Sequence, residues 1–199
     1  MGMKYDNPAR RFELIPNFMK QGGFYSFVEV GCKEGRLTGA VLKNVPRSRV
    51  IAIDPWKAMP DHAGRIGGET YEEWDFDKIE AQFWDNVAGH NGRLEMRRQT
   101  SLEVAAHFNA LRLDGKMPKE DRRGFDVVFI DAAHDQENVE ADIRAWWPLV
   151  RTGGFLMGHD YQHKFPGTMR AVAKYFPLMR VGVMPDSIWM VMKAEDIGP

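Results

Sequence analysis

Three segments of the chain consist largely of apolar residues, and segments with helical periodicity separate them. The three are Phe24–Val30, Arg49–Asp54 and Phe125–Asp131. Their β-branched and aromatic residues are typical of strands, and strands that are apolar along their length usually belong to a parallel sheet with both faces covered. The alternation of strands and helices therefore predicts βαβ units in a doubly wound α/β fold.

Two further strand-like segments near the C-terminus are connected differently. They are Met179–Met184 and Ser187–Lys193, and only Pro185 and Asp186 separate them. Because two residues are too few for a helical crossover, these strands must be antiparallel. A mostly parallel sheet that ends in an antiparallel hairpin differs from the nicotinamide-binding doubly wound fold.

The other expected elements complete the alternation. We expect helices at Arg11–Lys20, Arg36–Lys43, Thr70–Val87, Ser101–Leu111, Gln136–Trp147 and Gly167–Phe176, and strands at Arg93–Arg98 and Phe155–His159. Thr70 and Glu73 have capping-box spacing, which places the start of the third helix at Thr70. Gly153 and Gly154 are expected to form a turn.

Size and composition predict a single domain over residues 1–199, with 1–22 as an N-terminal extension and 57–69 as a candidate lid loop. The chain has 199 residues, 44% of them hydrophobic, which is enough for one core. A net charge of −1 argues against a nucleic-acid partner. The single cysteine, Cys32, favours a reducing cytoplasmic location. No signal peptide or membrane-spanning run is expected, and hence no membrane partner.

A glycine-containing loop follows the first strand. After Glu29 the sequence reads Gly31-Cys32-Lys33-Glu34-Gly35. Gly31 lets the backbone turn sharply and approach a ligand, and the following helix offers free N–H groups. Dinucleotide enzymes bind pyrophosphate here with G-x-G-x-x-G, whereas Glu29 and Glu34 favour a ligand with an ammonium group. The alternative is an ordinary strand–helix turn.

An acidic residue, Asp54, ends the second strand, 23 positions after Gly31. A carboxylate at this strand end can accept hydrogen bonds from two ribose hydroxyls. Pro55 and Trp56 follow and could pack on a purine ring. The alternative is that Asp54 caps a loop and Trp56 fills the core.

Two polar residues, Thr100 and Ser101, follow the third strand. Their side chains could contact the edge of an adenine. The alternative is that Ser101 is the N-cap of the next helix.

The ends of the fourth and fifth strands carry the candidate catalytic residues Asp131, His134, His159 and Asp160. The switch point of a doubly wound sheet lies here, so these side chains should face the ligand crevice. Asp131 and Asp160 could bind magnesium or manganese, which would lower the pKa of a substrate hydroxyl. Alternatively, His134 or His159 acts as a general base without metal, or Asp131 caps a helix and His159 is a buried structural histidine.

The segment Phe125–Tyr161, FDVVFIDAAHDQENVEADIRAWWPLVRTGGFLMGHDY, resembles the class I S-adenosylmethionine (SAM)-dependent methyltransferases of the small bacterial catechol O-methyltransferase-like group. FVEVGCKEG and VIAIDPW match that group's first two motifs, and the resemblance extends over Phe24–Lys193. It implies a seven-stranded sheet with the strand order 3-2-1-4-5-7-6.

The resemblance also implies roles for individual residues. The methionine part of SAM would contact Glu29, Gly31 and Gly35, and the ribose would contact Asp54. The cofactor-binding residues would be Glu29, Gly31, Cys32, Lys33, Glu34, Gly35, Asp54, Pro55, Trp56, Thr100, Ser101, Asp131, Ala132 and His134. In metal-dependent members an acid at the Asp131 position and a D-N pair after the fifth strand hold the ion, whereas here Tyr161 follows Asp160.

We therefore predict a SAM-dependent enzyme that methylates an oxygen of a small hydroxylated acceptor, with magnesium or manganese as an optional cofactor and a homodimer as a candidate assembly. One alternative is an N-methyltransferase of the same fold. A second is a non-catalytic SAM-binding domain. A third, a nicotinamide-dependent oxidoreductase, would need G-x-G-x-x-G, which this loop lacks.

Overall fold

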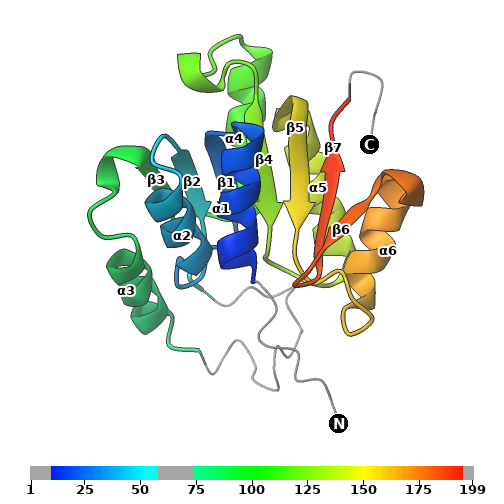
Figure 1. The fold of residues 1–199 in the computed structure, drawn as a ribbon, viewed down its shortest axis with the longest axis horizontal. Helices are drawn as coiled ribbons and strands as arrows, with labels where there is room; N and C mark the ends of the chain where they lie inside the picture. Colours follow the sequence, from blue (N-terminus) through cyan, green and yellow to red (C-terminus); the bar gives the residue numbers. More distant parts are fainter. Residues whose placement is uncertain (1–9, 58–73, 195–199) are drawn as a thin grey trace.

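The structure, a computed structural model, describes residues 10–57 and 74–194. Strands and helices alternate along most of the chain (Figure 1). The helices are α1 Arg11–Gly22, α2 Arg36–Asn44, α3 Phe76–Asn86, α4 Ser101–Leu113, α5 Gln136–Trp146 and α6 Pro166–Tyr175. The strands are β1 Ser26–Val30, β2 Arg49–Ile53, β3 Leu94–Arg97, β4 Phe125–Ile130, β5 Val150–Gly158, β6 Gly182–Met184 and β7 Ile188–Met192.

The strands form one seven-stranded sheet in the order β3-β2-β1-β4-β5-β7-β6 (Figure 1). The first five strands pair in parallel. β7 is antiparallel to both β5 and β6. The predicted strand order and the antiparallel C-terminal hairpin are both confirmed.

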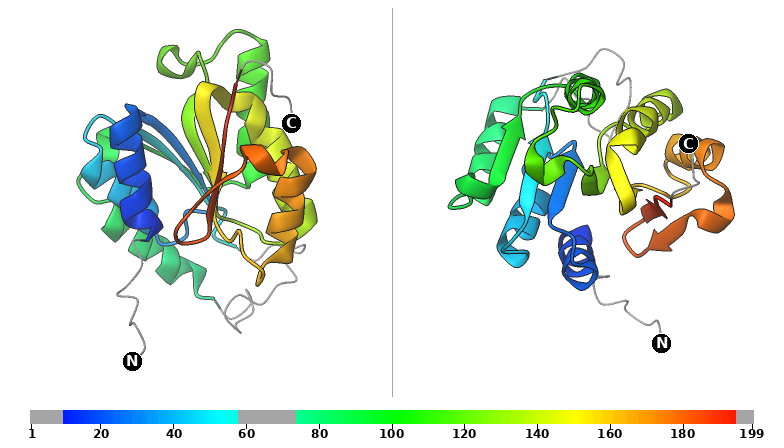
Figure 2. Two further views of the ribbon diagram at one scale, coloured as in Figure 1. Left: turned by 45° about the vertical axis from the view of Figure 1, so that its right-hand side comes forward. Right: turned by 90° about the horizontal axis from the view of Figure 1, so that it is seen from above.

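Helices cover both faces of the sheet, with α1 and α2 on one face and α4 and α5 on the other (Figure 2). Because successive side chains of a strand point to opposite faces, β1 contributes Phe27 to the core under α1 and α2 and Val28 to the core under α4 and α5. Burial on both faces explains why the central strands are largely apolar. Within the described part of the chain, no helix is long and apolar enough to cross a membrane.

The third helix begins later than predicted. Trp74 and Asp75 are not helical, and α3 starts at Phe76. The side chain of Asp75 accepts a hydrogen bond from the backbone N–H of Lys78, which makes Asp75 the N-cap. The predicted capping residues Thr70 and Glu73, and the lid-loop residues 58–69, lie outside the described residues.

The predicted turn at Gly153-Gly154 is wrong, because β5 runs through both glycines from Val150 to Gly158. The register of β5 against β4 shifts at this point, and Gly153 adopts a φ of 75°. A Cβ on Gly154 would lie 2.7 Å from the carbonyl oxygen of Asp126. The glycines thus permit a strand irregularity, which a sequence reading does not distinguish from a turn.

Candidate active site

A cavity of about 660 Å³ lies at the carboxyl ends of β1, β2, β4 and β5. Its volume is within the range of small-molecule sites, about 300–1,000 Å³. The predicted site residues that line it are Glu29, Gly31, Cys32, Lys33, Glu34, Asp54, Pro55, Trp56, Thr100, Ser101, Asp131, Ala132, His134, His159 and Asp160. The fold therefore brings together residues from five separate parts of the sequence.

The glycine loop makes close backbone contacts. Gly31 has a φ of 84°, and a Cβ there would lie 2.4 Å from the carbonyl oxygen of Asp131. Gly35 is the one predicted cofactor residue that does not line the cavity. It has a φ of 72° and lies against the ring of Phe83, 2.5 Å from where its Cβ would be, so a glycine here lets α2 start close to its neighbours.

Glu29 is buried at the end of β1, and its Oε2 accepts a hydrogen bond from the hydroxyl of Thr38 on α2 at 2.5 Å. Burial raises the pKa of Glu29 to about 8, although the hydrogen bond from Thr38 acts in the opposite direction. Burial also raises the pKa of the neighbouring Cys32 thiol, so this cysteine is an unreactive thiol in the loop wall.

Asp54 joins the glycine loop to the end of β2. Its Oδ2 accepts from the backbone N–H of Lys33 at 2.9 Å, and its Oδ1 accepts from the backbone N–H of Trp56 at 2.8 Å. Burial raises its pKa, and these two hydrogen bonds oppose the rise. Trp56 is only 2% exposed and packs against Phe83, so most of its ring belongs to the core.

Ser101 is not the N-cap of α4, which was the alternative to a ligand contact. Thr100 is the N-cap, in a capping box with Glu103, which leaves the Ser101 hydroxyl free for other contacts. Trp146 Nε1 donates to Ser101 Oγ at 2.8 Å, and Ser101 Oγ donates to Asp142 Oδ1 at 2.5 Å. Thr100 therefore caps α4, whereas the neighbouring Ser101 links α4 to α5 at the cavity wall.

Asp142 also lines the cavity, from α5, and sequence analysis did not find it. It is 5% exposed, and burial raises its pKa to about 7 although the hydrogen bond from Ser101 lowers it. An acid between the buried residues Val139, Ile143 and Trp146 on the apolar face of α5 is the sequence signal that could have indicated it.

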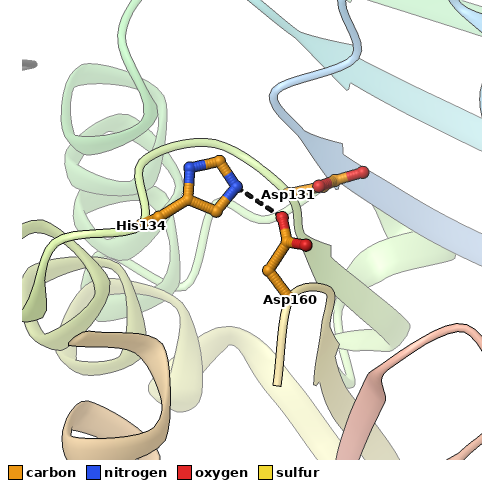
Figure 3. A group of neighbouring side chains, drawn as sticks. All are labelled: Asp131, His134 and Asp160. Carbon is orange, nitrogen blue, oxygen red and sulfur yellow. Dashed lines mark hydrogen bonds and ion pairs between the residues drawn. The ribbon is translucent and has the colours of Figure 1, made fainter. Parts of the chain in front are cut away.

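His134 and Asp160 form a close pair at the ends of β4 and β5. The Nε2 atom of His134 lies 2.5 Å from Oδ2 of Asp160 (Figure 3), and the His134 ring stacks on Phe165. Burial alone would raise the pKa of Asp160, but the hydrogen bonds from His134 and His159 outweigh it and lower the pKa. Asp160 adopts a φ of 58°, a costly conformation that is common at functional sites.

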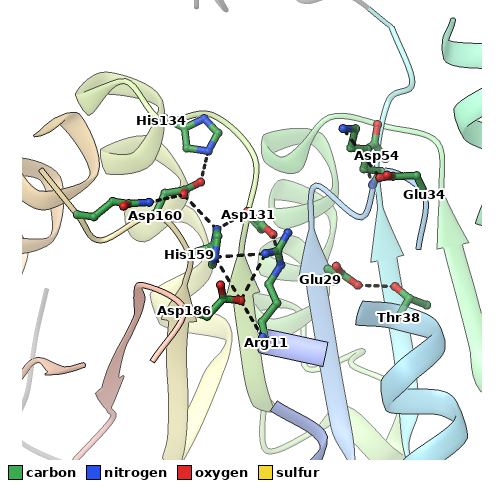
Figure 4. A network of polar contacts seen from close by, with 12 residues as sticks. Arg11, Glu29, Glu34, Thr38, Asp54, Asp131, His134, His159, Asp160 and Asp186 are labelled. Atoms are coloured by element: carbon green, nitrogen blue, oxygen red, sulfur yellow. Dashed lines mark hydrogen bonds and ion pairs between the residues drawn. The ribbon is translucent and has the colours of Figure 1, made fainter. Parts of the chain in front are cut away.

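Arg11, the first residue of α1, enters the same cluster and was also missed by sequence analysis. Its Nε lies 3.1 Å from Oδ2 of Asp131, and its Nη1 lies 3.2 Å from Nε2 of His159 (Figure 4). Its backbone N–H donates to Oδ2 of Asp186, in the turn between β6 and β7, at 2.8 Å. No local motif marks this arginine, because its partners lie far away in the sequence.

The two predicted metal ligands, Asp131 and Asp160, do come together, and His134 joins them, each of the three offering an atom within 4.8 Å of the others. In this arrangement, however, every carboxylate oxygen faces a nitrogen. Asp131 faces Arg11 and His159, and Asp160 faces His134 and His159. A magnesium or manganese ion could use the His134 nitrogen as a ligand, but it would have to displace Arg11 from Asp131 or lie next to the Arg11 guanidinium, and this positive charge disfavours a divalent cation here.

A family model described as a methyltransferase domain matches residues 28–161, well over half of the chain. The chain belongs to this methyltransferase family. The match runs from β1, through the glycine loop and Asp54, to the residues just after β5, so it spans most of the cavity wall. No curated protein sequence matches the chain significantly.

Solved structures of methyltransferases share the fold. An O-methyltransferase of Bacillus cereus, solved with S-adenosylhomocysteine (SAH), has a TM-score of 0.62 at 18% identity, covering 96% of this chain and 84% of that one. The O-methyltransferase TomG of Streptomyces achromogenes, solved with SAM, has a TM-score of 0.62 at 12% identity, covering 92% and 80%. At these identities the similarity establishes the shared class I fold.

Proposed function

We propose that this methyltransferase transfers the methyl group of SAM to an oxygen of a small hydroxylated acceptor. The observation that carries the proposal is one cavity with two chemically different ends. Glu29 and Asp54 line one end, and the His134–Asp160 pair lines the other. The two solved structures of the same fold described above are O-methyltransferases with SAH or SAM bound, which supports both the cofactor and the choice of oxygen.

The cofactor end suits each part of SAM. Glu29 can pair with the ammonium group of the methionine part. Asp54 uses its two oxygens for backbone N–H groups, and the remaining lone pairs can accept from two ribose hydroxyls. Thr100, Ser101 and Asp142 line the same cavity and would surround the adenine.

The reaction at the other end is an in-line displacement. The acceptor oxygen forms a bond to the sulfonium methyl, the C–S bond breaks with its electron pair going to sulfur, and the hydroxyl proton goes to a base. An ionised carboxylate only accepts hydrogen bonds, so Asp160 fixes the proton of His134 on Nε2. This leaves Nδ1 of His134 as the proton acceptor, and alignment of the two reactants provides much of the rate.

Two measurements test the proposal. Calorimetry with SAM and SAH tests the cofactor, and formation of SAH from SAM with a panel of phenols, catechols, sugars and amines tests the reaction. Methylation of oxygen acceptors supports the proposal. Turnover with amines alone would make the protein an N-methyltransferase, and SAM binding without turnover of any acceptor would make it a SAM-binding domain.

We further propose that residues 1–199 form one methyltransferase domain. The loop 57–69 remains a candidate lid, and partial proteolysis with and without SAH would test it, because a lid that closes on the cofactor becomes protected. Homodimer formation also stays a prediction, which the molar mass in solution would test.

A further inference from the structure

We infer that Arg11 takes the place of a divalent cation at the acceptor end of the cavity, the end lined by His134 and Asp160, so that the methyl transfer needs no metal. The inference rests on the proposed function for its reaction, but its structural basis is separate. That basis is the contact between the Arg11 guanidinium and Asp131, one of the two carboxylates that would otherwise bind a metal.

Each carboxylate oxygen of Asp131 and Asp160 already has a nitrogen partner. Asp131 has Arg11 Nε at 3.1 Å from Oδ2 and His159 Nδ1 at 3.6 Å from Oδ1. Asp160 has His134 at 2.5 Å from Oδ2 and His159 at 3.2 Å from Oδ1. Because a guanidinium only donates hydrogen bonds, its contact with His159 Nε2 leaves the His159 proton on Nδ1, directed at these carboxylates.

Arg11 is held in this position at its backbone as well as at its side chain. Asp186 accepts the hydrogen bond of the Arg11 N–H, and α1 packs on the sheet through the fully buried Ile15 and Met19. A guanidinium keeps its positive charge at all physiological pH values. A divalent cation bound by Asp131 would therefore face a fixed like charge, which disfavours its binding.

The guanidinium can also stabilise the negative charge that develops on the acceptor oxygen, as a metal ion would. Arg11 lines the cavity, and its guanidinium lies over the ring of Phe12. Its Nε and Nη1 are engaged by Asp131, His159 and Asp186, whereas Nη2 has no hydrogen bond or ion pair with another described residue. Figure 4 shows the guanidinium beside Asp131 at this end of the site. As His134 removes the acceptor proton, Nη2 can donate to the oxygen on which negative charge develops.

The test uses Mn²⁺ as the probe and counts free ion by electron paramagnetic resonance, on the full chain with and without SAH. The wild-type protein should bind no Mn²⁺ up to about 1 mM, the weak end of oxygen-ligand cation sites. The substitution Arg11→Met removes the guanidinium from Asp131. The variant should therefore bind Mn²⁺ at least about tenfold more tightly than the wild-type protein. Arg10→Met removes the neighbouring exposed arginine and should leave Mn²⁺ binding unchanged.

Two results would overturn the inference: stoichiometric Mn²⁺ binding to the wild-type protein, or Arg11→Met binding no more Mn²⁺ than wild type. The wild-type titration decides the matter even if the Arg11 variant does not fold. Turnover should also be unaffected by a chelator, and loss of turnover restored by Mn²⁺ would reject the inference. Failure of SAH to bind would instead refute the proposed function, while the Mn²⁺ titration of the free protein still tests Arg11.

Discussion

His134 and Asp160 lie 2.5 Å apart, Nε2 to Oδ2, although 26 positions separate them in the sequence. The carboxylate orients the imidazole, and Phe165 stacks on its ring. A histidine held in this way by a carboxylate has the geometry of an oriented general base.

The first prediction concerns this pair. His134→Ala should lower kcat by about 10²- to 10⁴-fold, the usual contribution of a general base, and Asp160→Asn should lower it as well because the imidazole loses its orientation. Calorimetry should give a SAM affinity close to that of wild type. His107→Ala is the control, since His107 is exposed on α4 and does not line the cavity. A larger loss of SAM affinity than of turnover would reassign both residues to cofactor binding.

The second prediction concerns the ribose contact. Asp54→Ala should weaken SAM binding by about 1–3 kcal/mol, since two hydroxyls lose a charged acceptor. Calorimetry measures the change. The control is Asp114→Ala, because Asp114 is exposed and its one ion-pair partner among the described residues is Lys116. Unchanged affinity in Asp54→Ala would remove the ribose role and leave Asp54 as a loop residue.

The third prediction couples SAM binding to protons through Glu29. With its pKa raised to about 8, Glu29 is largely protonated in the free protein at pH 7, and pairing with the ligand ammonium requires the carboxylate. SAM binding should therefore release protons, and its affinity should rise between about pH 6 and 7.5, below the pKa of a free α-amino group. Calorimetry at pH 7 in buffers of different ionisation enthalpy measures the release, which Glu29→Gln should abolish.

The fourth prediction concerns fold stability and Asp142. Its pKa is about 7 in the folded protein and about 3.9 when unfolded, so the native state binds the extra proton between these values. The contribution of Asp142 to the free energy of unfolding is therefore fully present below about pH 4 and is lost as the pH rises through about 7. Urea unfolding across this range should show a steeper loss for wild type than for Asp142→Asn. Equal slopes would show that Asp142 is already ionised in the native state.

The sequence brought the residues at the ends of β1 and β2 together more completely than it did the surroundings of Asp131. Gly31 and Asp54 lie at fixed places relative to β1 and β2, so the order of elements alone puts them at one sheet edge. Asp142 was missed because what marks it is its burial and the hydrogen bond that it accepts from Ser101 on another helix, and neither is visible in the sequence. The sequence also does not show that Phe83 packs against Gly35, for which a ligand contact stays a prediction.

By itself the sequence determined the fold class, the strand that begins each βαβ unit and the antiparallel hairpin, because apolar periodicity and connection length are local properties. Only the tertiary structure decided what surrounds Asp131. Its partner Arg11 is 120 positions away in sequence, on a helix whose place depends on packing against the sheet and on the contact with Asp186. Contacts of this kind leave no spacing pattern, since they arise when distant elements fold together.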